Sequence, residues 1–229
     1  MLKKTPIAAG IAALATIFIA GGCAVADADK SNAVDYTAMT PEELAEHLIF
    51  EANGFVLDQE VQEGGTTRQR MVQDDLHKAC SVIGGGDPDQ ETLEAVRAAA
   101  AESIVYPEGG IELGDWERGR ELAWSGFGYR VGHKTDDHSA RDVGGNCYNC
   151  HQLATDRTGG NLGPSLTGYG KTRGTSEAML KYAYDMIYNP HVYFPCTNMP
   201  RFGHSGFLDE QAIADIMAYM FDPESPVNE

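Results

Sequence analysis

The sequence predicts an all-α protein. Several segments repeat apolar residues at intervals of three and four, as the run from Ile213 to Met220 does, and this spacing is typical of one face of a helix. No segment alternates apolar and polar residues as a half-buried strand would. Glycine and proline cluster between the periodic segments, for example at Tyr106–Gly110, and separate one expected helix from the next.

The amino terminus is predicted to be an export signal. Lys3 and Lys4 precede an apolar run, Ile7–Gly22, that is too short for a transmembrane helix. No other uncharged run approaches spanning length, so we expect no transmembrane span in the mature protein. The expected location is the periplasm.

Two ways of processing this signal stay open. Ala26-Asp27-Ala28 fits a cleavage site, which makes residues 1–28 the signal peptide. Ala20-Gly21-Gly22-Cys23 instead resembles a bacterial lipobox, although alanine stands at its first position where leucine is usual. In that case the signal is residues 1–22, and Cys23 becomes a lipid-anchored first residue.

Residues 29–110 are expected to form a helical N-terminal extension. Thr40-Pro41-Glu42-Glu43 starts a helix, because it supplies a hydroxyl N-cap, a proline at N1 and a glutamate at N3. Gly54 is a plausible end for that helix. A second helix is expected over Thr67–Val82, and a third from near Asp89 to about Ser103.

Residues 111–229 are expected to form a second helical region, which begins with a short helix over Asp115–Leu122. A glycine inside a helix costs about 1 kcal/mol relative to alanine. Gly119 therefore predicts close packing of this helix against another element.

The last two expected helices have recognisable ends. Thr175 or Ser176 caps the first of them, which reaches about Asn189. Asp209 caps the second, and Pro223 ends it.

The charge of the chain limits the partners it can bind. Lys and Arg number 17 against 34 Asp and Glu, a formal net charge of −17. Binding to nucleic acid requires a basic face that neutralises phosphates, so nucleic acid is excluded as an expected partner.

Cys147-Tyr148-Asn149-Cys150-His151 is the most informative motif of the sequence. C-x-x-C-H is the spacing at which two thiols attach to the vinyl groups of a haem and the following histidine binds its iron. A redox dithiol or half of a zinc site also contains C-x-x-C. Zinc requires a second pair of ligands at short spacing, and Cys80 and Cys196 are isolated. We therefore predict one covalently bound haem c.

The segments after the motif are rich in glycine. Gly160–Leu166 and Tyr169–Lys171 provide backbone that is able to lie closely against a flat ligand.

Met199 is the predicted second axial ligand of the iron. A methionine opposite a histidine raises the reduction potential relative to two histidines. The other methionine candidates lie on apolar helical stripes, where methionine usually fills the core, whereas Met199 precedes a proline in a non-helical segment. The competing methionines are Met179, Met186, Met217 and Met220, and the competing ligands of other types are His191, His204 and Cys196.

Cys80 and Cys196 are predicted to form a disulfide, because two such thiols in an oxidising compartment normally pair. The enclosed loop exceeds 100 residues, so the chain-entropy stabilisation approaches roughly 4–5 kcal/mol. This bond would restrain Met199. The alternative, that Cys196 binds iron or reacts with sulfur species, stays open.

These residues resemble the class I cytochromes c. The resemblance rests on Asp115–Leu122, the C-x-x-C-H motif, Gly163-Pro164 and Ala218-Tyr219. It implies a class I cytochrome c fold over residues 111–229, in which the first and last helices cross with Gly119 against Tyr219. It also implies that the carbonyl of Pro164 accepts the free N–H of His151.

A narrower resemblance is to SoxX, the monohaem subunit of the SoxAX thiosulfate-oxidising complex. It rests on Gly145–Gln152, Gly163–Leu166, Tyr169–Gly174, Asn198–His204 and parts of the extension, and no resemblance covers residues 29–60. It implies Cys147 and Cys150 as haem anchors and His151 and Met199 as iron ligands, with no catalytic residue in this chain.

The SoxX resemblance also implies a function and partners. The chain would be the electron-transfer subunit of an L-cysteine S-thiosulfotransferase, accepting electrons released when thiosulfate is joined to a cysteine of the carrier SoxYZ. The sulfur chemistry would take place at a SoxA-type partner, and a further acceptor would take the electrons. Two alternatives stay open: a free-standing periplasmic electron shuttle, and a gas sensor or peroxidase with an open iron site.

Overall fold

The computed structural model describes residues 34–61, 65–81, 88–128, 137 and 139–229. In this part of the chain it contains helices and no strand, only an isolated antiparallel bridge between Glu60 and Thr66, which confirms the all-α prediction. None of the helices found there is long and apolar enough to cross a membrane. The predicted export signal and Cys23 lie outside the described residues.

The chain divides into two compact units, residues 1–38 and 39–229. The described part of the first unit contains the short 3₁₀ helix η2 (Tyr36–Ala38). All other elements belong to the second unit. The predicted boundary near residue 110, between the extension and the cytochrome domain, stays a prediction.

Helix α1 (Pro41–Glu46) begins as the sequence predicts. The Thr40 hydroxyl accepts the N–H of Glu43, and the Glu43 carboxylate accepts the N–H of Thr40 at 2.8 Å. This reciprocal capping box satisfies two donors that a helix start leaves unpaired. The helix continues through a π-helical turn, η3 (His47–Glu51), and ends before Gly54.

The single helix predicted over 67–82 is wrong, because the structure has two. Helix α2 (Thr67–Met71) stops where Val72 becomes extended, and α3 (Asp75–Cys80) starts anew with Asp74 as its N-cap. The Asp74 carboxylate accepts the N–H of His77 at 2.7 Å. A side chain that caps the following turn favours a fresh helix start over continuation. Val82 lies outside the described residues.

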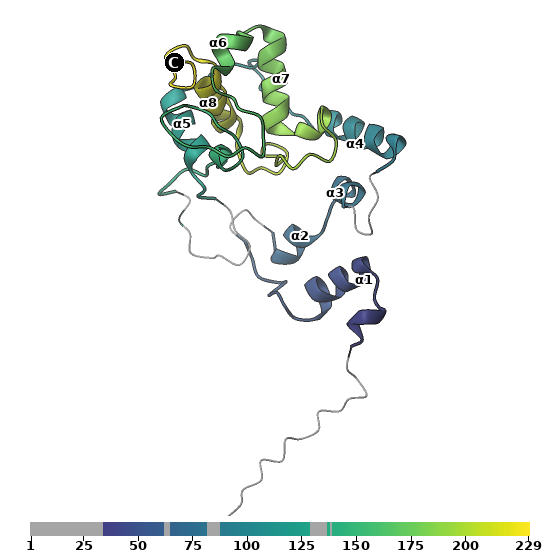
Figure 1. Cartoon of the computed structure of the whole chain (residues 1–229). Coiled ribbons are helices and arrows are strands. Elements are labelled where there is room, and N and C mark those ends of the chain that lie inside the picture. Colours follow the sequence, from purple (N-terminus) through teal and green to yellow (C-terminus); the bar gives the residue numbers. More distant parts are fainter. Residues whose placement is uncertain (1–33, 62–64, 82–87, 129–136, 138) are drawn as a thin grey trace, which may run out of the picture. The chain divides into compact units, whose positions relative to one another are not determined.

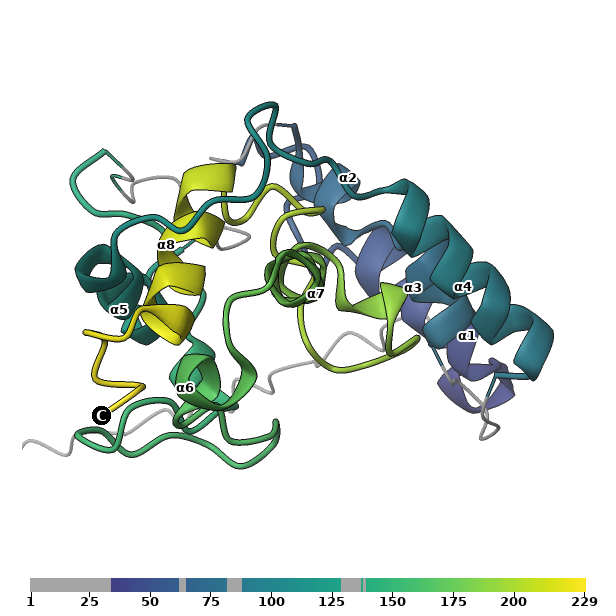
Figure 2. The same cartoon turned by 90° about the horizontal axis from the view of Figure 1, so that it is seen from above.

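Three of the remaining helices pack around α8. Helices α5, α6 and α7 all contact α8, and Figures 1 and 2 show α8 between α5 and α7. The predicted caps Ser176 and Asp209 are confirmed, since each accepts a backbone N–H of the following turn. Asp89 and Asp115 cap α4 and α5 in the same way. The bounds are α4 (Gln90–Glu102), α5 (Trp116–Trp124), η4 (Cys147–Asn149), α6 (Tyr169–Arg173), α7 (Glu177–Tyr188), η5 (Pro190–Val192) and α8 (Glu210–Phe221).

Tyr169–Lys171 lies in helix α6, and its expected approach to a flat ligand stays a prediction. A β-carbon at Gly170 would lie 2.5 Å from the carbonyl oxygen of Phe221. Tyr169 packs edge-on against the Phe221 ring. This segment therefore packs against the end of α8.

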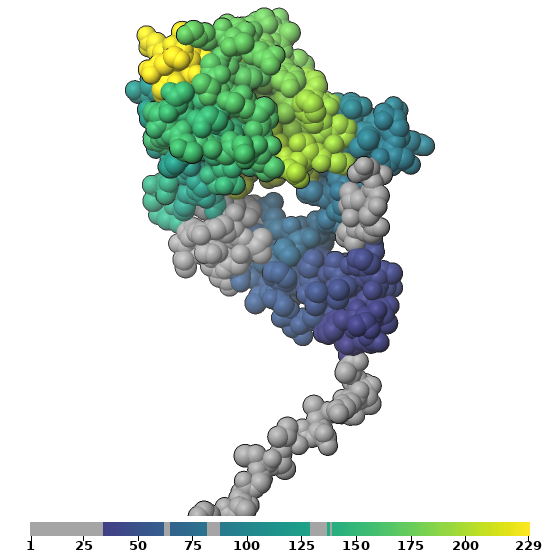
Figure 3. Space-filling view, viewed as in Figure 1, coloured from purple at the N-terminus to yellow at the C-terminus, as the bar shows by residue number. Residues whose placement is uncertain are grey.

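Helix α4 joins the core through its C-terminal end. Asn189, which is fully buried, donates to the Ser103 hydroxyl at 2.9 Å, and the Tyr184 hydroxyl donates to the carbonyl of Val105. In the space-filling view the surface of α4 adjoins that of α7 and the segment after it (Figure 3).

Helices α5 and α8 approach each other most closely at Gly119. A β-carbon at this position would overlap the carbonyl oxygen of Asp215 and lie 3.0 Å from the nitrogen of Ile216. The predicted close packing of Gly119 is thus confirmed. The resemblance implied Tyr219 as the partner of Gly119, but the atoms nearest to Gly119 are backbone atoms of Asp215 and Ile216, one turn earlier on α8.

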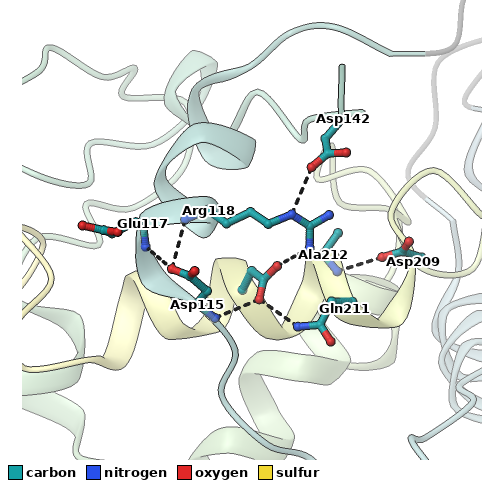
Figure 4. Close-up of polar contacts among 8 residues, drawn as sticks. Asp115, Glu117, Arg118, Asp142, Asp209, Gln211 and Ala212 are labelled. Atoms are coloured by element: carbon teal, nitrogen blue, oxygen red, sulfur yellow. Dashed lines mark hydrogen bonds and ion pairs between the residues drawn. The ribbon is translucent and has the colours of Figure 1, made fainter. Parts of the chain in front are cut away.

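A buried carboxylate fixes the same crossing. Asp215 is 1% exposed, and it accepts hydrogen bonds from the Asp115 N–H at 2.8 Å and the Gln211 side chain at 2.9 Å. The Arg118 guanidinium pairs with it and also with Asp142, 3.0 Å away. Figure 4 shows these side chains of α5 and α8 converging. A buried charge with this many partners holds the two helices in one register.

We expect Gly119→Ala to destabilise the fold by about 3 kcal/mol, because the added methyl forces α5 away from α8. Denaturant unfolding of the purified protein measures the free energy. Gly109→Ala is the matched control, since nothing lies within 4 Å of a β-carbon there. Equal stabilities of the two variants would contradict the close contact.

Candidate haem-attachment site

The C-x-x-C-H motif is wound into one helical turn. Asn146 opens the turn in the left-handed region, at φ 49°, and η4 follows. The N–H groups of Cys150 and His151 both donate to the carbonyl of Cys147, at 3.1 and 2.8 Å. The two thiols, three positions apart, and the histidine that follows the second one are thereby placed on one turn, as attachment to a haem requires.

The residues before the motif are hydrogen-bonded to the end of α5. The N–H of Gly145 donates to the carbonyl of Leu122 at 2.9 Å, and that of Asn146 to Ser125 at 2.9 Å. A β-carbon at Gly144 would overlap the Ser125 side chain. The position of the motif therefore depends on the position of α5.

Tyr148, between the two cysteines, fixes the motif to α8. Its side chain is 4% exposed, and its hydroxyl lies 2.7 Å from that of Tyr219 and accepts the N–H of Ala154. Burial, followed by the hydrogen bond with Tyr148, raises the pKa of Tyr219, so the Tyr219 hydroxyl stays neutral. Trp124 packs edge-on against Tyr148 at 5.4 Å. The sequence analysis missed this role, because the spacing rule leaves both intervening residues free.

His151 presents one free ring nitrogen. Its Nδ1 lies 2.8 Å from the carbonyl oxygen of Pro164, which confirms the partner implied by the cytochrome c resemblance. A carbonyl only accepts hydrogen bonds, so Nδ1 carries the proton, and the lone pair of Nε2 is available to bind a metal.

Glycines bring the following loop against the motif. A β-carbon at Gly163 would lie 2.6 Å from Nδ1 of His151, and one at Gly159 or Gly160 would overlap the motif backbone. The N–H of Gly163 donates to the carbonyl of Cys150 at 2.8 Å. The glycine-rich backbone predicted to face a flat ligand is thus held against the histidine ring and the motif itself.

The donor set fits a covalently attached haem. Cys147 and Cys150 are both unpaired, and burial raises the pKa of the Cys147 thiol to about 12, which keeps it neutral. Among the described residues no group of three or more His, Cys, Asp or Glu side chains is arranged to hold a metal ion. A zinc site built on this C-x-x-C therefore finds no second ligand pair there.

Met199 lies in the irregular segment between η5 and α8, where it is half-buried and packs against the core around α7 and α8. Its role as an iron ligand stays a prediction. Met217 and Met220 are buried in that core, as the sequence analysis expected of core methionines. Met179 is half-buried against the same cluster.

The rival ligands of other types have partners or positions of their own. Cys196 is bonded to Cys80 with an S–S distance of 2.09 Å, which confirms the predicted disulfide. The buried His191 accepts the N–H of Cys196 at its Nδ1, 2.8 Å away. His204 is exposed.

Protonation of His191 should destabilise the protein. Burial, followed by the positive charge of Arg201, lowers the pKa of His191 to about 4. A depressed folded-state pKa means that this stabilisation is complete above the unfolded value near 6.5 and is lost as the pH falls toward about 4. We expect a loss of at most about 3 kcal/mol across that window, and chemical denaturation at several pH values measures it. The dependence should flatten in His191→Gln, and an unchanged profile in that variant would contradict the assignment.

Gly163→Ala should displace the His151 ring, because the added methyl occupies the space beside Nδ1. We expect the covalent attachment to survive and the yield of six-coordinate haem to fall about tenfold, as misplacement of a positioned group typically costs at least this much. Absorption spectroscopy of the purified variant measures the yield. Gly109→Ala serves again as control, and a normal spectrum for Gly163→Ala would show that the ring has room to move.

The cytochrome c family model matches residues 140–222, which include the motif, the glycine loop, Met199 and α8. An uncharacterized lipoprotein of Aquifex aeolicus (strain VF5) is 41% identical over 164 residues, which cover 69% of this chain and 73% of that protein. Residues 111–229 make up about half of the chain, so this match also includes residues before 111. The crystal structure of SoxXA from P. pantotrophus aligns with 55% of this chain and 95% of that one, at 21% identity and a TM-score of 0.35. A score of this size is too low to establish a shared fold.

Proposed function

Since the chain belongs to the same family as the A. aeolicus lipoprotein and carries a cytochrome c domain, we propose that it transfers electrons through a single haem. Cys147 and Cys150 would hold the haem covalently, and His151 and Met199 would bind its iron. The haem supplies one-electron chemistry when bound. The observation that carries the proposal is the hydrogen bond from Nδ1 of His151 to Pro164, which leaves Nε2 as a metal ligand.

The residues of the chain shape that site in three ways. The η4 turn presents the two thiols, the Pro164 carbonyl orients the imidazole, and the core around α7 and α8 packs against Met199. A hydrogen bond to the far nitrogen raises the basicity of the ligating nitrogen. Burial and a thioether ligand both favour the reduced iron, so we expect a reduction potential above that of a bis-histidine haem.

More specifically, we propose that the chain is the SoxX-like subunit of a SoxAX L-cysteine S-thiosulfotransferase. The support is the sequence resemblance over Gly145–Gln152 and Asn198–His204. Joining thiosulfate to a carrier thiolate forms one S–S bond and releases two electrons. A chain with one haem passes these singly, so it requires a partner such as SoxA that performs the sulfur chemistry on the carrier SoxYZ, and a downstream acceptor.

We also propose that the mature chain works in the periplasm and is lipid-anchored at Cys23. The relative in A. aeolicus is named a lipoprotein, and Ala20-Gly21-Gly22-Cys23 resembles a lipobox. A tether would keep the haem near membrane-bound electron acceptors.

Co-purification from the membrane and periplasmic fractions separates the subunit from the free-standing shuttle. We expect a haem-bearing partner to co-purify, and thiosulfate to reduce the haem of this chain only when that partner and its carrier are present. Dithionite reduction of each sample is the control for haem content. Haem reduction by an isolated diffusing donor, with no stable partner, would favour the shuttle.

Met199→Ala should leave the haem attached and open the iron to exogenous ligands. We expect imidazole or cyanide to bind at least about tenfold more tightly than to the unaltered protein, because no thioether competes. Titration followed by absorption measures this affinity. Met186→Ala is the matched control, since Met186 is also half-buried but lies on α7. Unchanged ligand binding in Met199→Ala would assign the sixth position to another residue.

A further inference from the structure

Helix α3 of the extension is joined to the Met199 segment at two points, one on each side of the methionine. Three residues before Met199, Cys196 is bonded to Cys80 at the C-terminal end of α3. Two residues after it, Nη2 of Arg201 lies 2.8 Å from Oδ2 of Asp74, the N-cap of α3. The links span 116 residues in the first case and more than a hundred in the second.

The Arg201 end of the second link is buried. The Arg201 side chain is 8% exposed, whereas that of Asp74 is 44% exposed. The same Nη2 lies 2.9 Å from the ring nitrogens of His77, one turn further along α3. A guanidinium removed from water needs such partners, and once paired it has little freedom to move.

The opposite side of the Met199 segment is held by α7 and η5. Nδ1 of His191 accepts the N–H of Cys196, and the carbonyl of Tyr188 accepts the N–H of His204 at 3.1 Å. Gly203 lies so close to the Tyr188 ring that a β-carbon would overlap it. Between these contacts, the N–H of Met199 donates to the Thr197 hydroxyl at 3.4 Å. The position of Met199 therefore depends on the contacts of the residues on either side of it.

We propose that α3 is a positioning element for the sixth iron ligand, with Cys80–Cys196 and Asp74–Arg201 acting together to hold the Met199 thioether at the haem. The inference rests on the proposed function, because it takes Met199 as that ligand. It assigns a role to the N-terminal extension, which lies outside the residues that match the cytochrome c family model. Asp74 and Arg201 act through the segment and do not touch the iron.

Two anchors are expected to act non-additively. A thioether competes with external ligands through its effective concentration at the iron, which depends on how tightly its segment is tethered. Either anchor alone still holds the segment to α3, so the loss of one has a small effect. Loss of both frees the segment over its full length and lowers that concentration much further.

The test compares holoprotein variants. Asp74→Asn removes the carboxylate charge, Cys196→Ala with Cys80→Ala removes the disulfide, and a triple variant removes both. Imidazole affinity, the methionine–iron charge-transfer absorption of the oxidised haem, and the reduction potential are measured for each. We expect imidazole affinity to rise about 2–3-fold when either anchor is removed, and about tenfold or more when both are removed.

The control is Asp142→Asn, which likewise removes an exposed carboxylate from an arginine pair, here with Arg118 of α5. The buried Asp215 still pairs with Arg118 in that variant. Asp142→Asn should leave the absorption, affinity and potential unchanged. Asp74→Glu should bring the imidazole affinity most of the way back to that of the unaltered protein, because it keeps the charge at the N-cap of α3. If the triple variant does not fold, Asp74→Asn and the disulfide variant carry the test separately.

Each outcome separates the two proposals. If Met199→Ala opens the iron but the anchor variants match Asp142→Asn, the role of α3 is wrong and the electron-transfer proposal stands. If Met199→Ala changes nothing, Met199 is not the ligand, and the inference fails together with that part of the proposed function.

Discussion

The contact of Gly119 with the backbone of Asp215 sets the distance between α5 and α8, and the haem-attachment motif depends on that distance. Gly145 and Asn146 are hydrogen-bonded to the end of α5, while the hydroxyl of Tyr148 lies 2.7 Å from that of Tyr219 on α8. The motif therefore bridges both helices, and any movement of one relative to the other displaces the thiols. The buried Asp215 carboxylate adds a charged link at the same crossing. Helices α5 and α8 therefore fix the position of the haem-attachment motif without any contribution from a bound haem.

Helix starts were predictable from the sequence because a cap is a local interaction. Thr40, Ser176 and Asp209 each bond to a backbone N–H three residues ahead, so four residues contain the whole signal. The break between α2 and α3 was missed because Asp74 reads equally well as a surface residue inside one long helix. Its carboxylate also pairs with Arg201, more than a hundred residues away, and no local pattern reveals such a partner.

In the candidate haem site, too, local features were predictable from the sequence and tertiary contacts were not. Spacing alone identified Cys147, Cys150 and His151. The resemblance to the class I cytochromes c supplied Pro164, because Gly163-Pro164 matches a motif of that family. The contact of Gly163 with the imidazole was not predictable, because it requires the loop to fold back beneath the ring. The glycine content indicated that this loop lies close to another group, but only the tertiary structure shows that the group is the His151 ring.

The two sides of the proposed iron site are built on different scales. His151 is held by a partner 13 residues away, inside one loop, whereas each of the two links from the Met199 segment to α3 spans more than a hundred residues. The chemistry of the two ligands gives a reason for this difference. An imidazole is a strong ligand and needs only orientation, but a neutral thioether is a weak donor that competes with external ligands only while it is held in place. A long extension that fastens this weaker ligand would make the state of the iron depend on the folding of the whole chain, and not on the cytochrome c domain alone.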